Sequence, residues 1–160
     1  MEILNKGYIN GTHRLISPEQ TLANISHHLP AMGITRCANV TGLDRIGIPV
    51  YCSIKPRSRM VQIHNGKGLF TIAAKVSALM EAIEVFHYEN PSNELKRTCL
   101  KRIQDNGETV IHPHSLPLCF SNNYFSDNFI IDWAKGENLL TEEEVWIPGS
   151  AAYIASLNEL

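Results

Sequence analysis

The sequence predicts an α+β fold, with a mixed, mainly antiparallel sheet packed by two main helices. A long stretch without proline or glycine, residues 71–87, carries helical periodicity. Short strand-like segments stand before and after it, and connections of hairpin length favour antiparallel pairing between them.

The first helix is predicted to begin at the sequence SPEQ. Ser17 is the expected N-cap, Pro18 stands at the first helical position, and Gln20 closes a capping box. Apolar residues then recur at helical spacing until Pro30 and Gly33 interrupt the pattern. They are Leu22, Ile25, Leu29 and Met32.

Strands are predicted on both sides of the long helix. Residues 94–103 are mixed and basic, and the pattern leaves helix and strand open. The sequence NGKG at residues 65–68 is interpreted as a turn before the long helix. The predicted strands are residues 34–40, 49–54, 60–63, 109–111, 129–133 and 145–147.

The long helix carries the most informative feature of the chain. Ser77, Glu81 and Glu84 are offset by four and three residues, so they project from one narrow strip. Two carboxylates this close repel each other unless a positive group lies between them, and a divalent cation is the usual solution. Lys75 is the one lysine or arginine of this helix, and apolar residues border the strip. The pattern favours a binding site, and ordinary surface charges are the alternative.

Composition narrows the class of protein. The 160 residues are 44% hydrophobic and 19% charged, with a formal net charge of -2, which suits one domain over residues 1–160. This composition argues against a disordered chain and against a nucleic-acid binder that relies on bulk positive charge. The apolar runs are too short to span a bilayer and there is no signal-peptide pattern, so we expect a cytoplasmic protein without a membrane partner.

Several other polar groups carry weaker signals. Cys37, Cys52, Cys99 and Cys119 are widely spaced and are predicted to be free thiols. His64 precedes NGKG and is a candidate for lining a site. Ordinary surface or loop positions are predicted for the His112/His114 pair, the basic residues 96–97 and 101–102, and the acidic residues 142–144.

Several phrases of the sequence together resemble the YcaO family, most closely its TfuA-associated, thioamide-forming branch. The resemblance is close from about residue 10 to 90 and looser beyond. The phrases are GTHR (11–14), SPEQTL (17–22), GITR (33–36), ANVTGLDRIGIPVY (38–51), NGKG (65–68) and SALMEAIE (77–84).

The resemblance implies a function in ATP-dependent activation of peptide backbone amides, with ATP and Mg²⁺ as cofactors. By position in the motifs, Glu81 and Glu84 correspond to the first pair of metal- and nucleotide-binding carboxylates. Arg14 matches a phosphate-contacting position and Thr21 a hydroxyl that contacts the nucleotide. Ser77 and Lys67 are further ATP-binding candidates, although Lys67 also fits an ordinary surface position.

The resemblance also leaves alternatives open. The family places a second carboxylate set, E-x-x-E-R-like, further along, and this chain contains none. We therefore expect either a fragment of a longer protein, comprising the N-terminal portion of a YcaO domain, or a truncated, inactive relative. The implied partners are a peptide or protein substrate, a TfuA-like protein and further copies of the chain. A non-catalytic interaction module, or an accessory factor of ribosomal protein S12 methylthiotransferase, is the alternative function.

Overall fold

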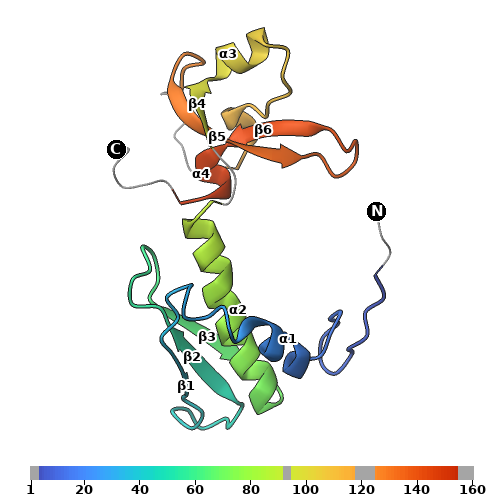
Figure 1. Cartoon of the computed structure of the whole chain (residues 1–160), viewed down its shortest axis with the longest axis vertical. Helices are drawn as coiled ribbons and strands as arrows, with labels where there is room; N and C mark the ends of the chain where they lie inside the picture. The colour runs from blue at the N-terminus through green and yellow to red at the C-terminus, as the bar shows by residue number, and fades with distance from the viewer. Residues whose placement is uncertain (1–3, 92–94, 118–124, 155–160) are drawn as a thin grey trace. The chain divides into compact units, whose positions relative to one another are not determined.

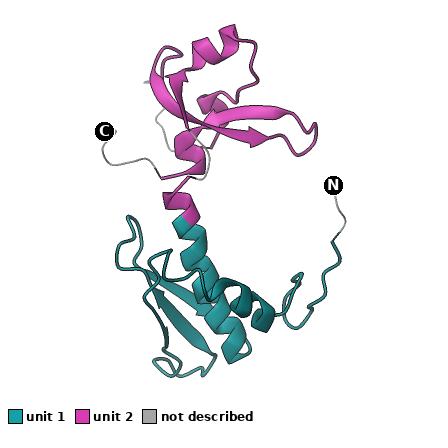
Figure 2. Cartoon of the chain, in the orientation of Figure 1, with its two compact units in different colours: residues 1–86 teal, residues 87–160 magenta. Residues whose placement is uncertain are grey.

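The computed structural model describes residues 4–91, 95–117 and 125–154. The chain divides into two compact units, residues 1–86 and 87–160, and each is described on its own (Figure 2). Two three-stranded antiparallel sheets and α-helices make up these units, so the predicted α+β class is confirmed.

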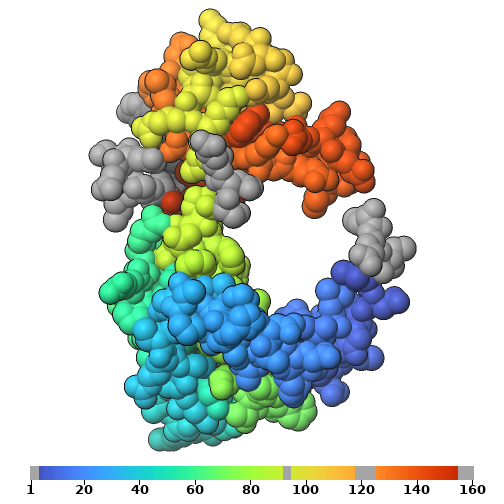
Figure 3. Space-filling view, in the orientation of Figure 1, coloured from blue at the N-terminus to red at the C-terminus, as the bar shows by residue number. Residues whose placement is uncertain are grey.

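The first unit is built around two helices, α1 (Pro18–Ile25) and α2 (Thr71–Glu89), the second of which continues past its boundary. The predicted capping box is confirmed, because the Ser17 hydroxyl accepts a hydrogen bond from the Gln20 backbone N–H at 3.3 Å and the Gln20 side chain accepts from Ser17. The segment containing α1 lies against α2 (Figure 3). Their shared core consists of Ile34, Leu79, Ala82 and Ile83, flanked by Leu22, Ile25, Leu29, Met32 and Cys37.

Three antiparallel strands form the sheet of this unit in the order β1-β2-β3 (Figure 1). They are β1 (Arg36–Asn39), β2 (Val50–Ile54) and β3 (Ile63–Lys67). Along β3, His64 and Gly66 are buried while the residues beside them are exposed. These two residues therefore lie on the inner face of the sheet, which packs against α2.

The predicted turn at residues 65–68 is wrong, because residues 65–67 continue β3. Gly66 has no positive φ, so it does not serve a turn. A Cβ on this residue would overlap the backbone of Ala74 and Ala78 in α2. Glycine is required here by the close approach of strand and helix. The predicted strand at residues 60–63 is correspondingly displaced toward the C-terminus.

The second unit contains a sheet of order β4-β5-β6, also antiparallel. Residues 94–103, left open between helix and strand, supply both, since β4 is followed directly by α3. Residues 109–111 form only an isolated bridge between Val110 and Trp146 where a strand was predicted. The elements are β4 (Lys96–Cys99), α3 (Leu100–Asp105), the short 3₁₀ helix η1 (Pro113–Ser115), β5 (Ile130–Glu137), β6 (Glu144–Pro148) and α4 (Gly149–Ala152).

Trp133 is the centre of the second core. Its side chain is fully buried with Leu100 and Ile103, and its indole N–H donates a hydrogen bond to the Thr98 carbonyl at 2.9 Å. The half-buried Trp146 packs against this cluster. Both tryptophans thus belong to the core of this unit.

Surface charges of this unit pair locally. Lys96 contacts Glu108, and Arg97 lies 3.6 Å from Asp132.

Within the described ranges, no helix is long and apolar enough to cross a membrane. Cys37, Cys52 and Cys99 are free and half-buried, as predicted, and Cys119 lies outside the described residues.

Candidate functional site

The acidic strip lies on an uninterrupted helix. Ser77, Glu81 and Glu84 are all exposed and fall within two turns of α2. Ala74 and Ala78, which border the strip, are fully buried against β3. The carboxylates therefore stand at the edge of the packed face, where solvent and the protein interior meet.

His64 reaches this strip from the adjacent strand. Its side chain is only 1% exposed, and its Nδ1 lies 3.7 Å from Glu81 Oε1, while the Glu81 side chain is 49% exposed. This separation is within ion-pair range but longer than a hydrogen bond. The sequence indicated His64 as a candidate for lining a site, and in the structure it lies next to the carboxylate of Glu81.

A second buried polar group lies beside His64. Ser53 on β2 is the register partner of His64 on β3, and side chains directly opposite in an antiparallel pair share one face. Ser53 Oγ and His64 Nε2 are both buried and have no hydrogen-bond partner within the described part of the chain. No motif in the sequence distinguished Ser53, because its significance depends on its cross-strand neighbour.

The remaining candidates come from three other elements. Arg14 closes a small hairpin with Tyr8, and the tip of this hairpin at Gly11 contacts Leu69, just before α2. Thr21 on α1 is half-buried, and its hydroxyl donates to the Ser17 carbonyl at 3.0 Å.

Lys67 is exposed at the end of β3. By strand alternation it belongs to the face opposite to His64 and Gly66. The structure therefore gathers Ser77, Glu81 and Glu84 on one element and brings His64 to them. It leaves Arg14, Thr21 and Lys67 on separate elements of the same unit.

The donor set of the strip suits a hard cation. Carboxylate oxygens are preferred Mg²⁺ ligands, and proteins usually bind this ion through one or two carboxylates together with substrate phosphates. Among the described residues, no group of three or more His, Cys, Asp or Glu side chains forms a closed metal cage. Two carboxylates alone are an open donor set, which needs further ligands such as phosphate oxygens to hold Mg²⁺.

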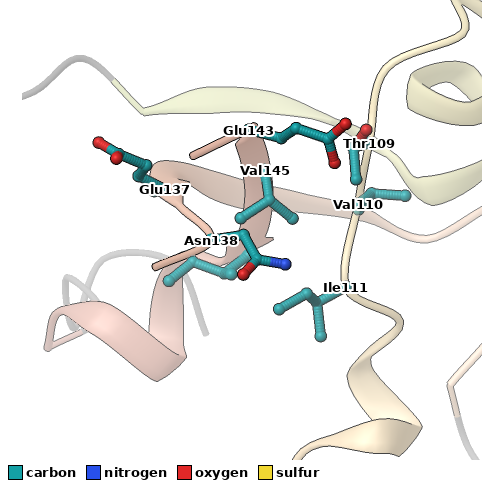
Figure 4. A pocket seen from close by; sticks show the side chains of 9 residues that line it. Thr109, Val110, Ile111, Glu137, Asn138, Glu143 and Val145 are labelled. Atoms are coloured by element: carbon teal, nitrogen blue, oxygen red, sulfur yellow. The ribbon is translucent and has the colours of Figure 1, made fainter. Parts of the chain in front are cut away.

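A separate hollow lies within the second unit, and no sequence pattern indicated it. It has a volume of about 460 Å³, between the segment 109–111 and the β5–β6 hairpin. Val110 and Ile111 line one side, with Val145 and Asn138 across from them (Figure 4). None of the predicted site residues lines this hollow.

Comparison with known proteins identifies relatives of much greater length. The chain is 32% identical over 145 residues to an uncharacterized protein of Mycobacterium tuberculosis, covering 91% of this chain and 32% of that protein. It is 34% identical over 140 residues to a protein of Methanothermobacter thermautotrophicus, covering 86% of this chain and 35% of the other. An uncharacterized protein in the tfuA 3′ region of Rhizobium leguminosarum bv. trifolii is 31% identical over 135 residues, covering 84% and 32%. The chain thus spans about a third of the length of the curated relatives it matches.

Solved structures share the fold. The structure of YcaO from Methanopyrus kandleri bound with AMPPCP and Mg²⁺ aligns with a TM-score of 0.71 at 24% identity, over 99% of this chain and 39% of that one. A heterocyclase in complex with substrate and cofactor aligns with a TM-score of 0.73 at 19% identity, over 96% of this chain and 25% of the heterocyclase chain.

The family assignment rests on the sequence itself. Residues 65–159 match the family model described as YcaO cyclodehydratase, ATP- and Mg²⁺-binding. This range includes the last three residues of β3 and the whole of α2, and so both carboxylates of the acidic strip. Since the matched range is more than half of its 160 residues, the chain belongs to the YcaO family.

Proposed function

We propose that this chain supplies one part of the Mg-ATP site of a YcaO-type enzyme that activates peptide backbone amides. The observation that carries the proposal is the pair Glu81 and Glu84, exposed together on α2 within the residues that match the ATP- and Mg²⁺-binding family. The chain spans about a third of the length of its relatives. The activity of the whole protein is therefore proposed along with the site.

In this proposal, different residues of the first unit bind the metal ion, the phosphates and the rest of the nucleotide. Glu81 and Glu84 would hold Mg²⁺, and its other ligands would include phosphate oxygens. Arg14 and Lys67 contribute positive charge toward the phosphates, and hydroxyls of Thr21 and Ser77 contact the nucleotide. The bound Mg-ATP supplies the phosphoryl group that converts an amide oxygen into a leaving group.

We further propose that the amide becomes a thioamide, with external sulfide as the nucleophile and a TfuA-like protein as partner. The relative in the tfuA 3′ region supports this branch. Azoline formation, in which a Cys, Ser or Thr side chain of the peptide is the nucleophile, is the other reaction of the family. A peptide is incubated with ATP, sulfide and the full-length relative from the tfuA 3′ region. The product mass distinguishes the two reactions, because thioamidation exchanges oxygen for sulfur whereas azoline formation removes water.

Calorimetric titration with Mg-AMPPCP tests the nucleotide site on this chain. We expect Glu81→Gln and Glu84→Gln each to weaken binding at least about tenfold, equivalent to about 1.4 kcal/mol. Glu137→Gln is the matched control, an exposed glutamate on β5. Equal affinities for all four proteins would contradict the assignment of the carboxylates.

An interaction module is the second candidate, and one observation favours it. Leu139 and Leu140, in the β5–β6 hairpin loop, are 90% and 94% exposed. Contiguous exposed apolar surface marks sites of association. Light scattering on the wild-type chain and on Leu139→Ser/Leu140→Ser tests for self-association. A concentration-independent monomer in both samples would count against this candidate.

A further inference from the structure

His64 differs from the other histidines because one ring nitrogen is directed at a candidate metal ligand. Its Nδ1 lies 3.7 Å from Glu81 Oε1, and its side chain is 1% exposed. We propose that His64 is a positioning residue that orients the Glu81 carboxylate for Mg²⁺. This inference rests on the Mg-ATP function proposed above.

The fold holds His64 in a fixed place. Its strand is hydrogen-bonded to β2 along its length, with His64 opposite Ser53. Two residues further on, Gly66 lies against the backbone of Ala74 and Ala78, so strand and helix cannot come any closer together. A glutamate side chain on a helix surface samples several rotamers, and a rigid neighbour with a donor nitrogen restricts them.

The buried surroundings of the ring support a role beyond packing. A histidine that serves only structure is expected to have both ring nitrogens hydrogen-bonded when buried. Here Nε2 has no partner among the described residues, and neither has the hydroxyl of Ser53. Burying these polar atoms costs stability, so the retained polar ring requires a reason. Orientation of Glu81 provides one.

The proposed role separates the two carboxylates. The Glu81 side chain lies 3.7 Å from His64, whereas no hydrogen bond or ion pair joins the Glu84 side chain to another described residue. His64 should therefore act on metal binding through Glu81 and not through Glu84. Partners that orient a metal ligand typically affect metal affinity 10–100-fold when they are removed.

The test is a pair of double-mutant cycles read by Mn²⁺ electron paramagnetic resonance and by calorimetry with Mg-AMPPCP. His64→Leu removes both ring nitrogens, and we expect it to weaken metal affinity by about 10–100-fold. His64→Asn keeps an amide nitrogen near the position of Nδ1, and we expect it to recover most of that loss. In the Glu81→Gln background His64→Leu should add no further loss, whereas in the Glu84→Gln background it should add its full effect.

The outcomes separate this inference from the function on which it rests. A wild-type chain that binds no Mg-AMPPCP contradicts the proposed function, and the inference falls with it. Wild-type binding that Glu81→Gln weakens and His64→Leu leaves unchanged overturns the inference alone. Equal losses for His64→Leu in both backgrounds also overturn it, because the effect would then not pass through Glu81. Thermal unfolding of each variant checks the fold. If His64→Leu does not fold, His64→Gln carries the test, because its amide reaches the position of Nε2 and leaves no nitrogen at Nδ1.

Discussion

Gly66 of β3 and Ala78 of α2 are in backbone contact, with no space for a side chain between them. The contact also involves the carbonyl of Ala74, one turn earlier in the helix. It sets the separation between the sheet and the helix that carries Glu81 and Glu84.

Replacing Gly66 tests this contact. Gly66→Ala should lower the free energy of unfolding by about 3 kcal/mol, because the added methyl meets helix backbone that has no room to move. Urea denaturation followed by far-UV circular dichroism measures it. Gly136→Ala, on β5, is the control. The nearest atom to its Cβ would be the Val145 carbonyl oxygen at 3.7 Å, so we expect a change within about 1 kcal/mol. Similar losses for both variants would contradict the packing argument.

In the absence of metal, substitution of the carboxylates should strengthen nucleotide binding, whereas with Mg²⁺ present it should weaken binding. With Mg²⁺ removed by EDTA, Glu81 and Glu84 repel the phosphates of AMPPCP. Glu81→Gln should then bind the free nucleotide more tightly than wild type, by up to about fivefold, or about 1 kcal/mol for a half-exposed charge pair. Calorimetry in EDTA measures this. A loss of affinity in both conditions would instead indicate that the variant damages the site sterically.

Cys37 should make stability depend on alkaline pH. Burial raises the pKa of its thiol, Cys52 adds to the rise, and the Lys75 ammonium opposes it without cancelling it. Below the ordinary thiol pKa of about 8.5 the thiol is protonated in the folded and the unfolded state, and its contribution to the free energy of unfolding is fully present. Above it the unfolded chain loses the proton first, so the free energy of unfolding falls as pH rises through the folded pKa.

Cys37→Ala should remove this part of the pH dependence. Urea denaturation of the wild type and of the variant between pH 7 and 10 provides the measurement, within the range where thiols ionise. We expect the two stability curves to converge as pH rises, because the wild type alone loses the contribution. Curves that stay parallel would show that Cys37 does not titrate as proposed.

Trp133 should dominate the stability of the second unit. Trp133→Phe removes the hydrogen bond to the Thr98 carbonyl and leaves a cavity in a fully buried cluster. We expect a loss of about 2–3 kcal/mol. Trp146→Phe is the matched substitution at a half-buried position, and it should cost less. Urea denaturation monitored by the fluorescence of the remaining tryptophan compares them, and an equal cost would contradict the assignment of Trp133 as the centre.

Local features were predicted well from the sequence. The capping box of α1 depends on Ser17 and Gln20, which are three residues apart, and the structure has it as expected. The acidic strip likewise depends on helical spacing within α2. By helical spacing Met80 falls on the apolar face of α2, but this residue is 40% exposed. A helix carries its own periodicity, whereas the width of its covered face depends on what packs against it.

Features that join distant segments were predicted poorly. Glycine in NGKG indicated a turn, because the sequence alone does not reveal that Gly66 meets α2. Ser53 carried no signal, since its partner His64 is brought opposite it only by strand register. The resemblance to the YcaO family supplied the roles of Arg14, Thr21 and Lys67, and these remain predictions.

By itself, the sequence determined the α+β class, the two helices and the strip formed by Ser77, Glu81 and Glu84. Backbone geometry repeats every few residues, so these features follow from neighbours along the chain. Only the tertiary structure decided that NGKG continues a strand, that Gly66 contacts Ala78 and that buried His64 stands behind Glu81. Those relationships arise from packing between segments far apart in sequence, where register and close approach are set by the whole unit.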